Sequence, residues 1–268
     1  MKKMIVLLSI PLIMGACTTN SITGRSQLSL LNDTELQSMA QQQYKQFLSE
    51  NKVVSSSTSK DAEMVRRIGQ RLVAAVTKYY KDKGLAAELE SYQWEYNLVD
   101  SKEANAWCMP GGKIVVYTGL LPITQNEAAL AVVVGHEISH ALAKHGNERM
   151  SQEMVAQGIG VAGGVLLSGN QKVSGIFNSI YGPGAQLGVL LPNSRKQELE
   201  ADKFGLIFTA MSGYNPQEAI PLWERMAQAS NGQSPPEFMS THPSESTRIQ
   251  RLRELMPEAL KYYKPMGR

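Results

Sequence analysis

The chain has 268 residues, of which 43% are hydrophobic, and its 27 basic and 24 acidic side chains give a formal net charge of +3. A chain of this length can build one well-formed core, and its sequence contains no internal repeat. The near balance of charge excludes the basic footprint of a nucleic-acid-binding protein. We therefore expect one globular unit whose function depends on local motifs.

The first 16 residues have the layout of a bacterial lipoprotein signal peptide. Two lysines and an apolar stretch from Met4 to Met14 precede Gly15-Ala16, directly before Cys17. The apolar stretch is too short to span a membrane as a helix. Cleavage before Cys17 would make it the lipidated N-terminus and leave Cys108 as a reduced, packed thiol without a disulfide partner. A secretory peptide cleaved elsewhere is the alternative.

The residues after Cys17 are expected to form a mobile polar tether, from 17 to 30, that lets an anchored protein stand off the membrane. Residues 31 to 268 are then a single domain. Thr18 does not resemble an inner-membrane retention signal, and this favours the outer membrane over the inner one.

Two helices and a strand are predicted next along the chain. The first helix starts at Asn32 or Asp33 and runs to about Ser49, and the second follows the serine-rich stretch 55 to 59 and runs to about Tyr80. Apolar residues of the second helix recur at helical spacing, which is typical of core rather than of a cofactor site. The stretch 92 to 99 alternates as a strand does. Its residues Trp94, Tyr96 and Leu98 are expected on one face.

A turn and a second strand follow. Pro110-Gly111-Gly112 predicts the turn, and residues 113 to 118 are rich enough in β-branched and aromatic side chains for a strand. We expect its outer edge, at Gly112, Lys113, Ile114 and Val115, to pair with an extended polypeptide through main-chain hydrogen bonds. The alternative is an ordinary central strand without a free edge.

His136-Glu137-Ile138-Ser139-His140 is an HExxH motif. Histidines four residues apart lie on one face of a helix, so both can bind one metal ion. Glu137 points to a neighbouring face, where it can act as general base on a water molecule that the metal activates. The helix is expected to begin with a capping box formed by Thr124 and Glu127. We expect it to end near Gly146, a plausible C-cap.

A zinc site of this kind needs a third ligand. The metzincin pattern fails, because it requires histidine where Gly146 stands and His145 is one position short. A second helical pattern, from Ser194 to about Met211, carries Glu198 and Asp202 on one face. Glu198 is assigned to the metal, although alone it could be a solvated helix charge. Asp202 is assigned as acceptor of a hydrogen bond from a ligand histidine.

Two further segments are harder to interpret. The glycine-rich and apolar stretch 158 to 191 is expected to form buried helical turns with loops, or alternatively a mobile lid over the cleft. His242 stands just before a C-terminal helix that Ser244 could cap, with Ile249, Leu252 and Leu255 on its apolar face. From the sequence alone, His242 is more readily interpreted as a histidine of a surface loop.

HEISH, followed by RKQELEAD and by STHPSESTRI, resembles the membrane-associated zinc metalloendopeptidases that include the CAAX prenyl proteases, HtpX, the mitochondrial Oma-type proteases and the LoiP and BepA proteins. The stretch NAWCMPGG is similar to the family's NAFALPGG, with Trp107 and Cys108 as departures. No tetratricopeptide pattern, as in BepA, is present. The resemblance implies a mainly helical α+β fold of the gluzincin type with a small β-sheet packed against the HExxH helix.

The same resemblance implies roles for particular residues. One Zn²⁺ per chain would be bound by His136, His140 and Glu198. His242 would lie at the active site, either donating a hydrogen bond to the oxyanion or blocking the metal in a resting state, with Arg248 helping to position it.

These features predict a zinc-dependent endopeptidase, and the resemblance implies that it cleaves unfolded or misfolded envelope proteins. It would be lipid-anchored through Cys17 and face the periplasm of a bacterial cell. The alternative is a chaperone-like assembly factor with a latent, self-inhibited protease activity.

Overall fold

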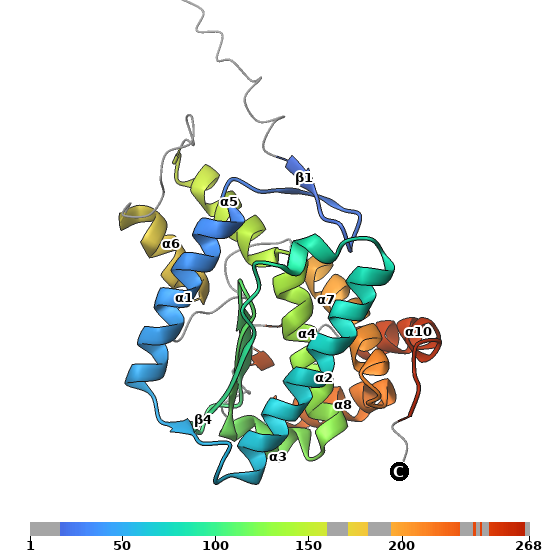
Figure 1. Cartoon of the computed structure of the whole chain (residues 1–268). Helices are drawn as coiled ribbons and strands as arrows, with labels where there is room; N and C mark the ends of the chain where they lie inside the picture. Colours follow the sequence, from blue (N-terminus) through green and yellow to red (C-terminus); the bar gives the residue numbers. More distant parts are fainter. Residues whose placement is uncertain are drawn as a thin grey trace, which may run out of the picture.

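A computed structural model describes residues 17–159, 171–181, 194–230, 238–239, 242 and 247–265 of the chain. The predicted leader, and Ser244 as a helix cap, lie outside these residues. Within them, helices predominate and one small sheet lies among them, so the expected mainly helical α+β fold is confirmed (Figure 1). The strands are β1 (Cys17–Thr19), β2 (Ser26–Leu28), β3 (Val53–Val54), β4 (Glu95–Val99), β5 (Ala106–Met109) and β6 (Lys113–Tyr117).

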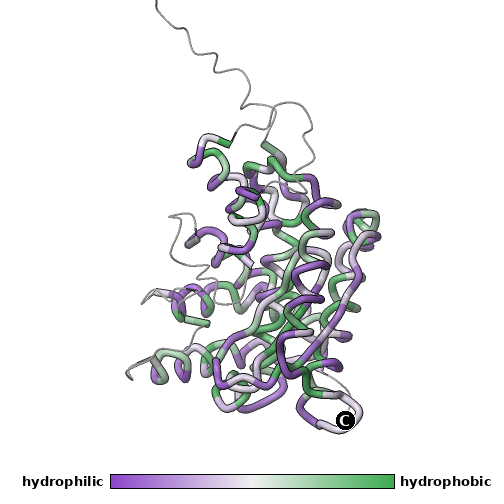
Figure 2. Tube along the Cα trace, turned by 90° about the vertical axis from the view of Figure 1, so that its left-hand side faces the viewer, coloured by the Kyte–Doolittle hydropathy of each residue, from purple (hydrophilic) through white to green (hydrophobic). Residues whose placement is uncertain are grey.

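The α-helices are α1 (Asp33–Glu50), α2 (Lys60–Asp82), α3 (Leu121–Thr124), α4 (Glu127–Leu142), α5 (His145–Ala156), α6 (Gln171–Tyr181), α7 (Ser194–Met211), α8 (Ala219–Ser230) and α10 (Arg248–Leu260). Short 3-10 turns are η1 (Ala86–Leu89), η2 (Thr118–Leu120) and η3 (Pro216–Glu218). Of the helices in the described part of the chain, none is long and apolar enough to cross a membrane. Hydrophobic and hydrophilic residues alternate along the helical traces, as expected for amphipathic helices (Figure 2).

The sheet is a middle layer with helices on both of its faces (Figure 1). Because successive strand residues point to opposite faces, Ile114 and Val116 join the core formed with α2, α4 and α7. Val115 and Tyr117 join a second core formed with α1, α5 and α6. Trp94, Tyr96 and Leu98 of the predicted strand share the α2 face, as expected. Helix α2 approaches closely there, because Gly69 leaves room for the Tyr96 ring.

The strand order β3-β4-β6-β5 corrects the expected substrate edge. Strand β6 lies between a parallel neighbour, β4, and an antiparallel neighbour, β5. Main-chain groups of Gly112, Lys113, Ile114 and Val115 therefore cannot form an outer edge. The edge belongs to β5, which packs beside α4. The alternative interpretation, a central strand without a free edge, is therefore correct for β6. The order of strands depends on long-range packing, which the local sequence pattern does not encode.

The ends of helix α4 also differ from the expectation. Asn126 is the N-cap and accepts a hydrogen bond from the Ala129 amide at 2.8 Å. The predicted capping box is wrong, because Thr124 lies in α3, where its hydroxyl donates to the Leu121 carbonyl. At the other end α4 stops at Leu142, and Lys144 adopts a left-handed conformation with φ of 55°. Gly146 is therefore not a C-cap.

Gly146 lies instead in α5, where the side chain of Tyr181 requires a glycine. A Cβ atom at this position would approach the Tyr181 hydroxyl to 1.4 Å. Tyr181 ends α6, whose apolar face carries Val173, Ile176 and Phe177 into the second core. This helix agrees with the buried helical turns expected between residues 158 and 191. The rest of that stretch, at 160–170 and 182–193, lies outside the described residues, as does any test of a lid.

Residues 17 to 30 do not form the expected tether. Strands β1 and β2 pair as an antiparallel hairpin, and two of its side chains bind main-chain carbonyls at the C-terminal end of α4. Asn20 Nδ2 donates to the Leu142 carbonyl at 3.2 Å, and Gln27 Nε2 donates to the Ala143 carbonyl at 3.1 Å. A helix end leaves carbonyls without intrahelical partners. The hairpin is held on the domain because it supplies those partners.

Candidate metal centre

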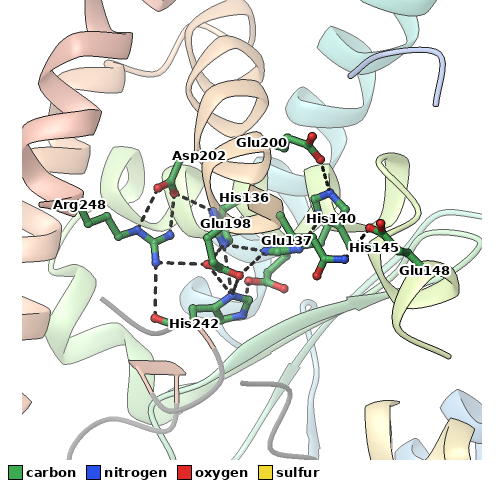
Figure 3. A network of polar contacts seen from close by, with 11 residues as sticks. His136, Glu137, His140, His145, Glu148, Glu198, Glu200, Asp202, His242 and Arg248 are labelled. Carbon is green, nitrogen blue, oxygen red and sulfur yellow. Dashed lines mark hydrogen bonds and ion pairs between the residues drawn. The ribbon is translucent and has the colours of Figure 1, made fainter. Parts of the chain in front are cut away.

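The candidate site forms where α4 and α7 cross at close range. Gly135 and Gly205 face each other at the crossing, and a Cβ atom on Gly205 would lie 2.9 Å from the His136 amide nitrogen. Two glycines thus let the helix backbones touch. As a result, the HExxH residues of α4 lie directly beside the acidic residues of α7 (Figure 3).

Four buried side chains direct donor atoms toward one point: His136, His140, Glu198 and His242. The two Nε2 atoms of His136 and His140 are 3.0 Å apart. Glu198 Oε2 lies 3.3 Å from His136 Nε2, and Glu198 Oε1 lies 3.2 Å from His140 Nε2. The structure therefore brings together all three residues that the sequence assigned to a metal.

His242 completes this cluster. Its Nδ1 atom lies 3.1 Å from both carboxylate oxygens of Glu198 and 3.3 Å from His136 Nε2. Its Nε2 atom faces Glu137 Oε1 at 3.2 Å. The ring also packs against Phe238, with centroids 4.5 Å apart. His242 is thus a buried residue of the cluster and not a surface histidine.

Asp202 and Arg248 surround the cluster on one side (Figure 3). Asp202 Oδ1 lies 3.0 Å from His136 Nδ1, so the outer nitrogen of this imidazole faces a carboxylate. Arg248 donates two hydrogen bonds to Asp202, at 2.9 and 2.7 Å, and its Nη1 lies 3.2 Å from Glu198 Oε2. The guanidinium stacks 3.6 Å from the centroid of the Trp223 ring. Arg248 therefore balances the charge of two buried carboxylates.

Burial and the neighbouring charges shift the pKa values of the cluster. Burial lowers the pKa of His136, but Asp202 and Glu198 outweigh it and raise this pKa to about 9. Burial dominates at His140 and holds its pKa well below the ordinary value. Burial also raises the pKa of the Glu137 carboxyl, against the opposing charges of His242 and His136. For Glu198 the positive neighbours outweigh burial, and its pKa lies well below the ordinary value.

The donor set fits a zinc ion. Tetrahedral zinc with nitrogen ligands at about 2.0–2.1 Å keeps its ligand atoms about 3.3 Å apart. The donor pairs that include His136 Nε2 or a Glu198 oxygen are 3.0–3.3 Å apart. Imidazole nitrogen and carboxylate oxygen are the ligand types of hydrolytic zinc sites. Buried Glu137 Oε1 and His242 Nε2 also lack a hydrogen bond among the described atoms, which suits a site that accommodates a further ligand.

A second set of charged residues near the cluster was missed by the sequence reasoning. His145 Nδ1 lies 2.8 Å from His140 Nδ1, and His145 Nε2 lies 2.9 Å from Glu200 Oε2. Arg25 of the hairpin binds both Glu200 and Glu148. The sequence did contain one indication of this set. The chain has only four histidines, and His145 follows the last residue of the HExxH motif by five positions.

Comparison with protein-family models matches residues 59–256 to Peptidase family M48. The chain is 33% identical over 224 residues to the mitochondrial metalloendopeptidase OMA1 of Schizosaccharomyces pombe, an alignment that covers 82% of this chain and 61% of that protein. It is 28% identical over 246 residues to the mitochondrial metalloendopeptidase OMA1 of Homo sapiens, with 90% and 46% covered.

The beta-barrel assembly-enhancing protease of Escherichia coli strain K12 is 29% identical over 162 residues, which are 58% of this chain and 33% of that protein. The chain spans about half the length of the curated relatives that it matches. The family match extends over most of the chain and includes the HExxH helix, Glu198, His242 and Arg248. Because both the aligned region and the buried donor cluster agree, the chain belongs to peptidase family M48.

Proposed function

We propose that the protein is a zinc-dependent endopeptidase that cleaves unfolded or extended polypeptides. The observation that carries this proposal is the buried convergence of His136, His140 and Glu198 beside the carboxylate of Glu137. Zinc held by these three residues, one ion per chain, would activate a water molecule and polarise the scissile carbonyl.

Glu137 is proposed as the general base. Its carboxylate is buried beside the cluster, and burial raises its pKa above the ordinary value, which favours acceptance of a proton. It would take a proton from the attacking water and pass it to the leaving amine. Asp202 is proposed to hold the outer nitrogen of His136, which fixes the orientation of the ring.

His242 is proposed to occupy the fourth donor position in a resting state. Its Nδ1 atom lies as close to Glu198 as the other two imidazoles do. Arg248 Nη1 contacts the main-chain carbonyl of His242 at 3.4 Å, which supports a positioning role for Arg248. In this conformation His242 would hold the place that water or substrate needs. This supports the second candidate function, a chaperone-like factor whose protease activity is latent.

Substrate is proposed to pair with β5. In the antiparallel ladder, the main chain of Asn105 and Tyr117 is joined by a hydrogen bond, and hydrogen-bonded pairs alternate along such a ladder. The N–H and C=O groups of Ala106 and Cys108 therefore point away from β6. An extended peptide added at this edge, beside α4, would be recognised through its main chain more than through its side chains.

We also propose a setting for this activity. A lipid on Cys17, which lies exposed at the start of β1, would hold the enzyme on the periplasmic side of a bacterial envelope, in the outer membrane more than the inner. The name of the beta-barrel assembly-enhancing protease supports a role in envelope protein quality control. Metabolic labelling with a radioactive fatty acid tests the anchor, because the Cys17→Ser variant should incorporate none.

Casein digestion tests the enzymatic proposal. Wild type and Glu137→Gln are compared, and zinc is measured in both proteins. We expect full zinc in both and no cleavage by the variant, since an amide cannot accept the proton. Equal cleavage by the two proteins would defeat the assignment of Glu137 and of the enzyme class.

A further inference from the structure

His145 is fully buried and contacts His140 on the side of the ring that faces away from the donor cluster. Its Nδ1 atom lies 2.8 Å from the outer nitrogen of His140, and its Nε2 atom lies 2.9 Å from Glu200 Oε2. It is absent from the converging donor set. His145 therefore links a proposed metal ligand to a carboxylate on α7 without facing the metal position (Figure 3).

The hydrogen-bond chain has a definite direction. A carboxylate only accepts hydrogen bonds, so His145 donates to Glu200 from Nε2. A neutral imidazole then has a lone pair on Nδ1, and this nitrogen accepts from His140. His140 must therefore carry its proton on Nδ1. Its Nε2 atom is left with a lone pair that points at the donor cluster, which is the tautomer a zinc ligand needs.

We infer that His145, held by Glu200, is a positioning residue that fixes His140 in its metal-binding tautomer. This inference rests on the proposed zinc site. Each histidine of the HExxH motif then has its own support: Asp202 behind His136, at 3.0 Å, and the His145 and Glu200 pair behind His140.

Arg25 determines which way Glu200 faces. Its Nε donates to Glu200 Oε1 at 2.7 Å and its Nη2 donates to Glu200 Oε2 at the longer distance of 3.2 Å. Nη1 and Nη2 also donate to the carboxylate of Glu148, at 2.6 and 2.7 Å. Gln197 Nε2 donates to Glu148 Oε2 as well, at 2.7 Å. The N-terminal hairpin thus reaches the residues behind the metal site. Glu148 shares Arg25 with Glu200 but has no hydrogen bond to His145 among those of the described residues, so it offers a matched control.

The Glu200→Gln substitution tests the chain of hydrogen bonds. In that variant the shorter hydrogen bond from Arg25 Nε, at 2.7 Å against 3.2 Å from Nη2 to Oε2, keeps the amide oxygen at the position of Oε1 and turns the amide N–H₂ toward His145. The amide then donates to His145 Nε2, His145 donates from Nδ1 to His140, and the His140 proton moves to Nε2, where it opposes the metal. Glu148→Gln makes the same change of charge beside the same arginine without touching His145.

Zinc affinity of the full chain is measured by competition with a chromogenic chelator, with the melting temperature of the zinc-free form recorded alongside. We expect Glu200→Gln to lose about tenfold to a hundredfold in zinc affinity, the range for groups that orient metal ligands. Glu148→Gln should keep its affinity within about threefold of wild type. Equal losses in both variants, or none in Glu200→Gln, would overturn the inference.

The tautomer itself is a second readout. In protein labelled with ¹⁵N at histidine, the wild-type spectrum should show His145 protonated at Nε2, and Glu200→Gln should show it protonated at Nδ1. A purely structural role for His145 would lower the melting temperature without moving this proton, and that result would contradict the inference. Failure of wild type to bind zinc at all would instead overturn the proposed function together with it.

Discussion

His242 Nδ1 lies 3.1 Å from each carboxylate oxygen of Glu198, as close as either histidine of the HExxH motif. In the proposed resting state, a group in this place would compete with substrate for the metal. We therefore predict that His242→Ala raises the rate of casein cleavage while zinc content stays at one per chain. The substitution would remove the imidazole from the fourth donor position and leave His136, His140 and Glu198 in place.

A fall in cleavage with zinc retained would contradict the blocking role. It would indicate instead that His242 donates a hydrogen bond to the oxyanion, the other role that the family resemblance implies. A fold control comes from the far-ultraviolet circular dichroism spectrum, which should match that of wild type. An unchanged rate would exclude both roles.

Arg248 forms ion pairs with both Glu198 and Asp202, which are buried carboxylates. Replacing it with methionine leaves two carboxylates buried without this partner. We predict that Arg248→Met lowers the free energy of unfolding by about 3–5 kcal/mol, as for other broken buried ion pairs. Urea denaturation of the zinc-free protein measures this loss.

Arg253 provides the control for this prediction on the same helix. Its guanidinium lies 3.8 Å from Glu224, and its side chain is 60% exposed. Exposed pairs of this kind contribute about 0–1 kcal/mol, so Arg253→Ala should change the free energy of unfolding little. Similar losses at the two arginines would show that helix α10 responds to any substitution, and that the buried ion pairs are not the cause.

Much of the site follows from local spacing. His136 and His140 share a face because they are four residues apart on one helix, and the same holds for Glu198 and Asp202 on α7. These relationships need no knowledge of the tertiary fold. A glycine on each helix then allows the close crossing that joins the two pairs.

Other parts depended on contacts that the sequence pattern does not encode. Lys144 adopts the left-handed conformation and ends α4, so His145 begins a new helix and turns back toward His140 instead of continuing the same face. The hairpin residues looked like a tether because their polar side chains suggested solvent. In the fold, Asn20 and Gln27 instead bind the carbonyls at the end of α4.

The ion pairs of Arg25 with Glu148 and Glu200 predict that the folded protein becomes less stable at acidic pH. Burial opposes ionisation of both carboxyls, but hydrogen bonds from Arg25, with Gln197 or His145, outweigh it and lower both pKa values below the ordinary 4.5. A carboxyl whose pKa is lower in the folded state contributes stability above its unfolded pKa and loses it as the pH falls. Stability should therefore decline as the pH drops below about 4.5.

Arg25→Met should flatten this decline, because both carboxyls lose the guanidinium that lowers their pKa. We expect the urea midpoints of wild type and variant to differ most near pH 6 and to converge as the pH falls through the lowered pKa values of the two carboxyls. The urea midpoints of Arg25→Lys should lie between those of wild type and Arg25→Met. The lysine ammonium keeps the positive charge but lacks the planar guanidinium that donates several hydrogen bonds at once. Parallel curves for wild type and Arg25→Met would show that the hairpin contributes no acid-sensitive stability.

The assignment of the substrate edge to β5 is tested by amide hydrogen exchange. In the ladder with β6, the amide of Trp107 points toward β6, whereas that of Cys108 points away from it. The inactive Glu137→Gln variant is mixed with excess unfolded casein peptide, and exchange is followed residue by residue in nuclear magnetic resonance spectra. We predict that peptide slows exchange at Cys108 and leaves Trp107 and Ile114 unchanged, because only the outward amide gains a new partner. If exchange at Cys108 stays the same while peptide is bound, substrate does not extend the sheet at β5, and recognition must occur on another surface beside α4.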